Sequence, residues 1–273
     1  MSPIKEPNYF VRHAVQGGSF DLIQDKAEYL RLFSKSDRCV AIGEASSTYL
    51  WDPDSPKLIH EAVPHARIIM ILRDPIDRAY SQYLMRIKIR RLKSSFYDQL
   101  MRDYNSKEKV WGASDLYIEF GMYYEQVKRY LDQFGKEQVK IILFEEFIHH
   151  PTEKVNEVLS FLGINHRVTD ADVNKQHNPF LVPRSPLSVW VYAFFRWLRS
   201  RNIKFYKVLK LLPDSLTESQ VEKFLLKKTQ KPLPEPQAIK FLQEIYREDI
   251  IRLEALLGRS LPWHSVSKFL KDK

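Results

Sequence analysis

The chain has 273 residues, a formal net charge of +9, 44% hydrophobic and 28% charged residues, and a single cysteine, Cys39. One cysteine excludes an internal disulfide, and no Cys/His cluster has the spacing of zinc ligands. The sequence contains no run of about 18 apolar residues, so we expect no membrane-spanning helix. The length suffices for one α/β domain, and the basic surface favours anionic partners: nucleotides, acidic glycans, nucleic acid or anionic membrane. Residues 1–10 lack the apolar run of a signal peptide, so we expect a cytoplasmic protein.

The N-terminal part of the chain predicts three short elements. Apolar residues recur with helical spacing in residues 21–33. The apolar run 39–42 predicts a buried strand, in which Cys39 is a structural thiol rather than a reactive one. Residues 55–62 begin with Ser-Pro and predict a short helix.

A strand–helix unit follows. The five apolar residues 68–72 do not alternate with polar ones, which predicts a parallel strand covered on both faces. Residues 76–87 then place apolar side chains on one helical face, and the basic run 86–93 closes the helix. That run either complements the helix dipole or forms a rim that attracts an anionic acceptor.

The alternation of strands and helices continues along the chain. We expect a helix over residues 114–134 that is stopped by Gly135, a strand over 139–144, and a helix over 151–162 that is ended by Gly163. Strands that alternate with helices predict an α/β fold with a mostly parallel sheet flanked by helices.

The composition changes beyond residues 176–186, which hold three prolines. Residues 178–226 are predicted to be a variable, basic and aromatic helical insertion, with its basic and aromatic side chains concentrated in 189–212. Such a segment packs on the core with a solvated basic face, forms a lid over an acceptor, or lies on a membrane surface. Residues 227–232 form a basic loop before the last helix.

The stretch from Arg73 to Ser81 is typical of a phosphate-binding site. Arg73 ends the predicted strand, Asp74 suits the N-cap, and Pro75 suits the first helical position. Ligands of open α/β sheets sit outside the carboxyl ends of the strands, where the guanidinium of Arg73 can fork onto two phosphate oxygens. Ser81 offers a hydroxyl about two turns into the helix. The alternative is a helix start with an ion-paired arginine.

Arg73, Pro75, Arg78 and Ser81 form the pattern Arg-x-Pro-x-x-Arg-x-x-Ser directly after a hydrophobic strand. This pattern resembles the 3′-phosphate-binding motif of sulfotransferases that use 3′-phosphoadenylyl sulfate (PAPS), and is most similar to bacterial relatives of heparan sulfate sulfotransferases. Further similar segments cover most of the chain in order: residues 4–10, 43–50, 117–134, 139–147 and 246–259. The resemblance implies a single sulfotransferase domain over residues 1–273 with a P-loop-NTPase-like fold.

One departure from the family concerns its phosphosulfate loop. Family members begin with a strand and a Lys-x-Gly-Thr-Thr-like loop, which cradles the 5′-phosphosulfate of the donor, and the sequence has no such loop. We therefore expect the first strand of the sheet and half of the donor site to be missing. Met1 is then an internal methionine of a longer reading frame, or the chain is a naturally shortened homologue.

The resemblance also implies roles for individual residues. Arg73 and Ser81 would hold the 3′-phosphate of PAPS, with Lys227 as a further candidate, and Glu6 would be the general base that takes the acceptor proton. Glu44 would shape the acceptor site or cap its loop. For Glu6, the alternative is an exposed acid in a frayed N-terminus. The scheme requires no metal.

Two positions differ from glycan sulfotransferases. Asn8 stands where some of them have a histidine, and Ala45 stands where they carry a lysine. These differences weigh against a second base and against a glycan contact at the respective positions.

Three functions remain open. In the first, the chain transfers a sulfuryl group from PAPS to a hydroxyl or amine of a carbohydrate-like acceptor. In the second, it is an inactive, shortened homologue that binds nucleotide or glycan. The third is a basic protein that binds nucleic acid or a membrane surface. The resemblance favours an anionic nucleotide and a glycan acceptor as partners, with membrane contact through residues 189–212 left open and no nucleic acid expected.

Overall fold

The computed structural model describes residues 1–14, 22–34, 39–90, 94–173, 181–183, 226–228 and 231–263. The chain divides into two compact units. The first comprises Met1–Leu84, Ser94–Asn174 and Pro234–Lys273, and the second comprises Met85–Lys93 and Lys175–Leu233.

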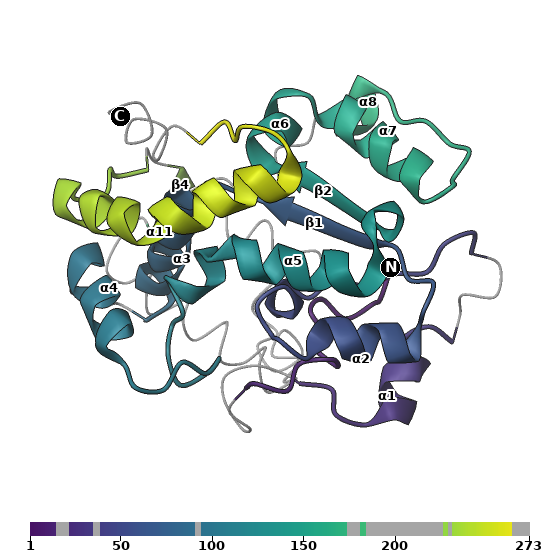
Figure 1. Ribbon diagram of the computed structural model, residues 1–273, viewed down its shortest axis with the longest axis horizontal. Helices are drawn as coiled ribbons and strands as arrows, with labels where there is room; N and C mark the ends of the chain where they lie inside the picture. Colours follow the sequence, from purple (N-terminus) through teal and green to yellow (C-terminus); the bar gives the residue numbers. More distant parts are fainter. Residues whose placement is uncertain are drawn as a thin grey trace, which may run out of the picture. The chain divides into compact units, whose positions relative to one another are not determined.

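A parallel pair of strands, β1 (Ile68–Leu72) and β2 (Val139–Leu143), lies in the middle of the first unit (Figure 1). Leu72 is opposite Leu143, so the carboxyl ends of both strands lie level at one edge. The predicted α/β class and the parallel pairing are confirmed. β2 ends one residue earlier than predicted because Phe144 already begins a helix.

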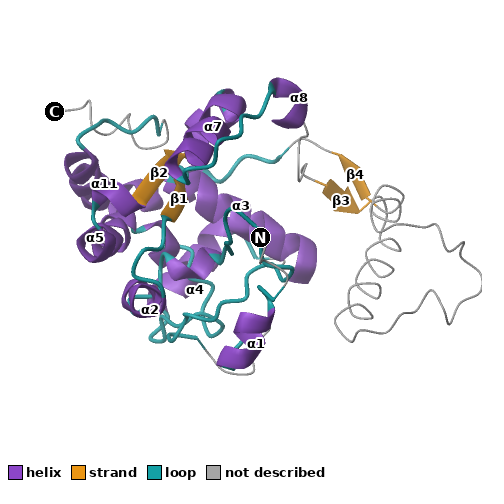
Figure 2. Ribbon diagram, turned by 90° about the vertical axis from the view of Figure 1, so that its right-hand side faces the viewer, coloured by secondary structure: helices purple, strands orange, loops and turns teal. Residues whose placement is uncertain are grey.

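Helices pack beside this sheet (Figure 2). α11 (Pro236–Leu257) packs against α5 (Tyr123–Phe134) and α4 (Phe96–Asn105), and α5 packs against α2 (Ser55–Ala62). The other elements of the first unit are short or follow the strands directly: α1 (Lys26–Arg31), η1 (Ser47–Tyr49), η2 (Glu119–Gly121), η3 (Lys136–Gln138), α6 (Phe144–His149), α7 (Pro151–Phe161) and α8 (Asp170–Val173). α3 (Pro75–Arg90) begins in the first unit and ends in the second.

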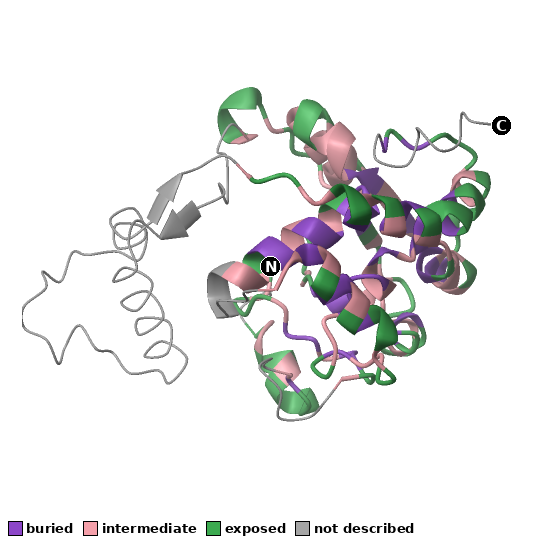
Figure 3. Ribbon diagram, turned by 90° about the vertical axis from the view of Figure 1, so that its left-hand side faces the viewer, coloured by how far each residue is buried: buried purple, intermediate pink, exposed green. Residues whose placement is uncertain are grey.

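The core of the first unit is rich in aromatic side chains, and Figure 3 shows its buried residues along the sheet and the inner helix faces. Tyr246 of α11 is fully buried, and its hydroxyl donates to the carbonyls of Tyr117 and Ile118, each at 3.1 Å. A Cβ at Gly121 would lie 2.6 Å from this hydroxyl, so only glycine admits the close approach of Tyr246.

In the second unit, β3 (Leu181–Pro183) pairs antiparallel with β4 (Leu226–Lys228). The predicted basic and aromatic segment at 189–212 lies outside the described residues. The insertion predicted over 178–226 therefore stays a prediction.

The predicted strand at residues 39–42 is wrong. Among the described residues, none pairs with this run, and an apolar run without a hydrogen-bonded neighbour cannot form a strand. Val40 and Ile42 are 85% and 56% exposed, and Cys39 is exposed as well, so its prediction as a buried thiol is also wrong.

β1 is covered on one face rather than on both as predicted. Met70 and Leu72 are buried, whereas Ile69 and Ile71 on the other face are 39% and 54% exposed. The helices of the first unit thus enclose only one side of this strand.

The helix predicted for residues 114–134 begins later, at Tyr123. The carboxylate of Asp103 accepts the backbone N–H groups of Leu116 and Tyr117, and Leu116 adopts a left-handed φ of 52°, which breaks the helical path. The carboxylate of Asp249 from α11 then accepts the N–H of Tyr124 at 3.2 Å and caps α5. Both acceptors are distant in sequence, so local periodicity missed the boundary.

Candidate functional site

Two residues follow the sheet at its carboxyl edge: Arg73 after β1 and Phe144 after β2. Because Leu72 and Leu143 are paired, these side chains meet, and the Arg73 guanidinium lies 4.9 Å from the centre of the Phe144 ring. The aromatic face holds the charge without consuming any of its N–H donors. Arg73 follows the strand as the sequence pattern predicts, whereas its contact with Phe144 was not predicted.

The start of α3 is built as predicted. The Asp74 carboxylate accepts the N–H groups of Ile76 at 3.0 Å and Asp77 at 3.3 Å, and Pro75 is the first helical residue. The Asp74 N–H donates to Glu145 of α6 at 3.0 Å, which ties the two strand ends together. Arg73 therefore stands on a rigid corner.

The guanidinium of Arg73 has an N–H group that no described residue accepts. Its Nε is buried and has no hydrogen-bond partner among the described residues. Its Nη2 lies 3.4 Å from Asp77, whose side chain is 54% exposed, while that of Arg73 is 27% exposed. A buried, unmatched N–H is costly, so the site is suited to an anion that accepts from the guanidinium.

Ser81 lies on the same side of α3. Arg73 pairs with Asp77, and Ser81 follows Asp77 by four residues, the spacing of neighbours along one helix face. Ser81 is partly buried, and no hydrogen bond joins its hydroxyl to another described residue. Its role in binding phosphate stays a prediction.

Arg78, the second arginine of the motif, is part of the scaffold. One Nη donates to Gln82 at 2.7 Å and the other to the carbonyl of Tyr117. The two Nη groups thereby fasten α3 to the loop before α5, while the Nε of Arg78, like that of Arg73, is buried without a partner among the described residues.

Tyr123 lies beneath this corner. It is 3% exposed, and burial raises its pKa to about 12, against the opposing influence of Arg78 and of the Arg73 backbone. The phenol therefore stays neutral and adds no charge that would compete with an anionic ligand.

The N-terminal segment packs on the loop before α2 and brings Glu6 and Glu44 into one cluster. Ser47 donates to Glu6 at 3.2 Å, and the hydroxyls of Tyr29, Tyr49 and Ser46 donate to Glu44 at 3.2, 2.6 and 3.0 Å. Burial, together with Glu44, raises the pKa of both tyrosines, so they remain donors. These hydrogen bonds engage both carboxylate oxygens of Glu44 within the structure. The predicted role of Glu44 in shaping the site of the sulfuryl acceptor stays a prediction.

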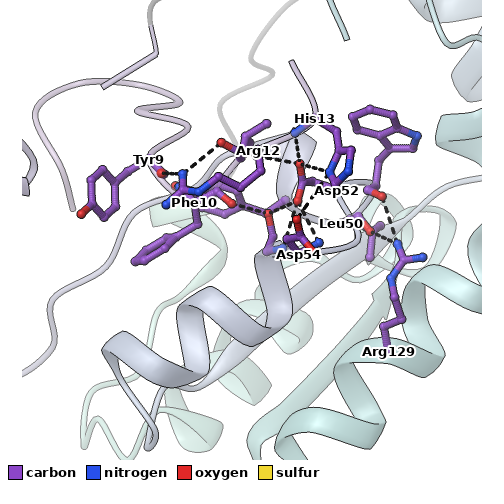
Figure 4. Close-up of polar contacts among 12 residues, drawn as sticks. Tyr9, Phe10, Arg12, His13, Leu50, Asp52, Asp54 and Arg129 are labelled. Carbon is purple, nitrogen blue, oxygen red and sulfur yellow. Dashed lines mark hydrogen bonds and ion pairs between the residues drawn. The ribbon is translucent and has the colours of Figure 1, made fainter. Parts of the chain in front are cut away.

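A second polar cluster, which sequence analysis missed, joins residues 10–13 to α2 (Figure 4). Asp52 is fully buried and accepts the backbone N–H groups of Arg12, His13, Asp54 and Ser55 at 2.8, 2.8, 3.0 and 3.0 Å. Figure 4 also shows Arg129 of α5, whose Nη2 donates to the carbonyl of Trp51 at 3.0 Å. The sequence signal was Asp-Pro-Asp-Ser-Pro at residues 52–56, a stretch rich in helix-start residues that runs into the first turn of α2.

A cavity of about 260 Å³ opens beside the N-terminal segment and is lined by Asn8, Tyr9, Val11, Arg12 and Ile23 among others. A cavity of about 310 Å³ lies along β2, where Lys140 and Lys154 both pair with Glu157 at 2.7 Å. Arg73 lines neither of these two cavities.

Other predicted features are placed as follows. Lys227 lies in β4 of the second unit, so its relation to Arg73 stays a prediction. Among the described residues, no hydrogen bond or ion pair joins the Glu6 and Glu44 cluster to Arg73. In the same part of the chain, no group of three or more His, Cys, Asp or Glu side chains could hold a metal ion, and no helix is long and apolar enough to cross a membrane.

Comparisons with known proteins agree with the strand-end motif. Residues 54–250 match the sulfotransferase domain family. The crystal structure of a sulfotransferase from Alicyclobacillus acidocaldarius is 28% identical and superposes with a TM-score of 0.66, covering 95% of this chain and 85% of that one.

Curated relatives match the chain over part of its length. Human carbohydrate sulfotransferase 15 is 25% identical over 157 residues, which are 46% of this chain and 28% of the relative. The mouse bifunctional heparan sulfate N-deacetylase/N-sulfotransferase 3 is 33% identical over 125 residues, which are 45% of this chain and 14% of the relative. The chain thus spans less than a third of either protein. Because the family match extends over more than half of the chain, and because the bacterial structure shares its fold, this chain belongs to the sulfotransferase domain family.

Proposed function

We propose that the protein transfers a sulfuryl group from PAPS to a hydroxyl or amine of a carbohydrate-like acceptor. The observation that carries the proposal is Arg73, whose buried Nε has no partner among the described residues and whose guanidinium rests on Phe144 at the carboxyl edge of the sheet. This arrangement suits the 3′-phosphate of the nucleotide. Ser81 would donate its hydroxyl to the same phosphate, and Lys227 would add a charge.

The proposed reaction is an in-line displacement at sulfur. The acceptor oxygen or nitrogen forms a bond to sulfur while the bond from sulfur to the 5′-phosphate oxygen breaks, and adenosine 3′,5′-bisphosphate leaves. Glu6 takes the proton of the acceptor as general base, and Glu44 shapes the acceptor side. The relatives whose names specify carbohydrate or heparan sulfate support a glycan acceptor.

A second candidate is a homologue that binds the nucleotide without turnover. The observation that favours it is the lack of a Lys-x-Gly-Thr-Thr-like loop in the 273 residues. Without that lysine, the charge that develops on the leaving oxygen loses a stabilising partner. Both candidates use the same Arg73 site, so binding and turnover must be measured separately.

Calorimetric titration of the whole chain with adenosine 3′,5′-bisphosphate tests the site, with 5′-AMP as the comparison ligand. We expect selective binding of the bisphosphate, and its loss in Arg73→Ala. Lys57→Ala is the matched control, because it removes one positive charge at a side chain that is 72% exposed on α2. Equal binding by Arg73→Ala and the parent chain would refute the site.

Turnover separates the two candidates. A ³⁵S-labelled donor is incubated with the chain and a panel of sugar alcohols and amines, and labelled product is counted. Label transfer that disappears in Glu6→Gln, with bisphosphate affinity unchanged, is the result expected for an enzyme. Selective binding without transfer is the result expected for the binding homologue.

A further inference from the structure

Two residues of the N-terminal segment have an unusual backbone conformation. Glu6 and Asn8 both have left-handed φ angles, 54° and 53°, on either side of Pro7. Asparagine tolerates this region better than glutamate does, so the strain is concentrated at Glu6. Such strain persists only where neighbouring groups enforce it, and it often accompanies function.

The group that enforces it is the side chain of Asn8. Its Nδ2 donates to the carbonyl of Glu6 at 2.7 Å, and its Oδ1 accepts the hydroxyl of Thr48 at 2.6 Å. Its own backbone N–H donates to the hydroxyl of Ser46 at 3.1 Å. We call Asn8, Ser46 and Thr48 the Asn8 clamp. Asn8 and Thr48 are 4% and 2% exposed, so water does not replace these bonds.

An amide is required at position 8 by its chemistry. Asn8 donates in one direction, to Glu6, and accepts from the other, from Thr48. An aspartate carboxylate would place an acceptor against the Glu6 carbonyl, and an aliphatic side chain would leave both groups unmatched.

The loop that carries the clamp also holds the carboxylate of Glu6. Ser47 lies between Ser46 and Thr48 and donates to Glu6 Oε1 at 3.2 Å. Ser46 in turn donates to Glu44 at 3.0 Å, which Tyr29 and Tyr49 fix from the other side. One loop thus holds both the backbone and the carboxylate of Glu6 in place. The residue remains partly exposed, so an incoming acceptor can reach it.

We propose that Asn8 is a positioning residue for Glu6. It acts through the Glu6 carbonyl and does not touch the acceptor. The inference rests on the proposed role of Glu6 as general base. A general base must be within hydrogen-bond reach of the proton it removes, and release of the clamp would let φ of Glu6 relax and carry the carboxylate out of that reach.

The test uses four substitutions in the whole chain. Asn8→Asp keeps the shape of the side chain but loses its N–H donor, and Asn8→Gly keeps the left-handed φ but loses the whole amide. Thr48→Val removes the hydroxyl at constant shape, and Thr48→Ser keeps the hydroxyl. With the labelled donor, we expect kcat to fall at least about tenfold in the first three. The donor KM and the bisphosphate affinity should not change, and Thr48→Ser should retain the rate. A merely structural role would lower the folded fraction without this pattern.

Crystal structures of Asn8→Asp and Asn8→Gly supply a readout that does not depend on activity. We expect φ of Glu6 to leave the left-handed region in both. An unchanged φ together with an unchanged kcat would overturn the inference. If the parent chain binds bisphosphate but transfers no label, the proposed enzymatic function fails, and φ of Glu6 in the two variants alone decides whether the clamp exists. If both Asn8 variants fail to fold, Thr48→Val and Thr48→Ser give the same comparison.

Discussion

Arg73 at the edge of the sheet and the carboxylates of the N-terminal polar clusters differ in how far their hydrogen-bonding groups are matched. At the sheet edge, Arg73 has a buried Nε without a partner among the described residues and one ion pair, with the exposed Asp77. In the N-terminal region, Asp52 accepts from four backbone N–H groups and Glu44 from three hydroxyls. Saturated groups hold a scaffold together, whereas an unsaturated group on a rigid support is available to a ligand.

The largest effect on stability should come from Asp52→Asn. Each carboxylate oxygen of Asp52 faces two backbone donors, so the new amide must point its NH₂ group at donors in either orientation. We expect the free energy of unfolding in urea to fall by about 3 kcal/mol or more. Asp54→Asn is the control, because that side chain is 54% exposed and should cost about 0.5 kcal/mol or less. A loss below about 1 kcal/mol at Asp52 would break the contrast between saturated and unsaturated groups.

Asp249 is an intermediate case, a buried carboxylate whose burial raises its pKa to about 6 despite the N–H groups of Tyr123 and Tyr124. The fold thus binds this proton more tightly than the unfolded chain, whose pKa is near 3.8. Its contribution to the free energy of unfolding is therefore fully present below about pH 4 and is lost as the pH rises towards 6, by up to about 3 kcal/mol. Urea unfolding at pH 4, 5, 6 and 7 should show this loss in the parent chain relative to Asp249→Asn. A constant difference between the two chains across this range would contradict it.

Arg73→Lys tests whether the fork of the guanidinium matters. Lysine keeps the charge but offers one point donor instead of two parallel N–H groups and stacks less well on Phe144. We expect the calorimetric affinity for adenosine 3′,5′-bisphosphate to fall about tenfold, or about 1.4 kcal/mol, while the free energy of unfolding changes by less than about 1 kcal/mol. An equal affinity would mean that charge alone defines the site.

The smallest effect is expected from Asp77→Asn. This change removes the carboxylate that contacts Arg73 at 3.4 Å and competes with an anionic ligand. Because the pair is largely solvated, the bisphosphate affinity should rise by no more than about fivefold, and less at high salt. Glu61→Gln is the matched control, an exposed acid in an i,i+4 pair with Lys57 on α2. A lower affinity in Asp77→Asn would show instead that Asp77 aims the arginine.

Local signals in the sequence predicted the sheet edge well. Asp74 and Pro75 mark a helix start by their own chemistry, and the apolar runs of β1 and β2 have the length of strands. Gly135 and Gly163 end their helices at positive φ, as glycine commonly does. All of these features are decided within a few residues.

Features that depend on distant partners could not be predicted. Thr48 lies 40 residues from Asn8, and Asp52 lies 40 and 39 residues from Arg12 and His13, which supply two of the four N–H groups it accepts. The helix start at Tyr123 depends on Asp249, which is 125 residues from the group it caps. Likewise, the apolar run at 39–42 looked like a strand because no local property reveals whether a neighbouring strand is present.

The hydroxyl of Tyr246 has a consequence for the order of events during synthesis. It closes a loop of 129 residues when it donates to the carbonyl of Tyr117. Arg78 of α3 donates to the same carbonyl. A ribosome that adds about 5–20 residues per second needs about 6–26 s between these two tyrosines. Throughout that interval the nascent chain presents an incomplete core around Tyr117, and α11, nearly the last element to emerge, completes it.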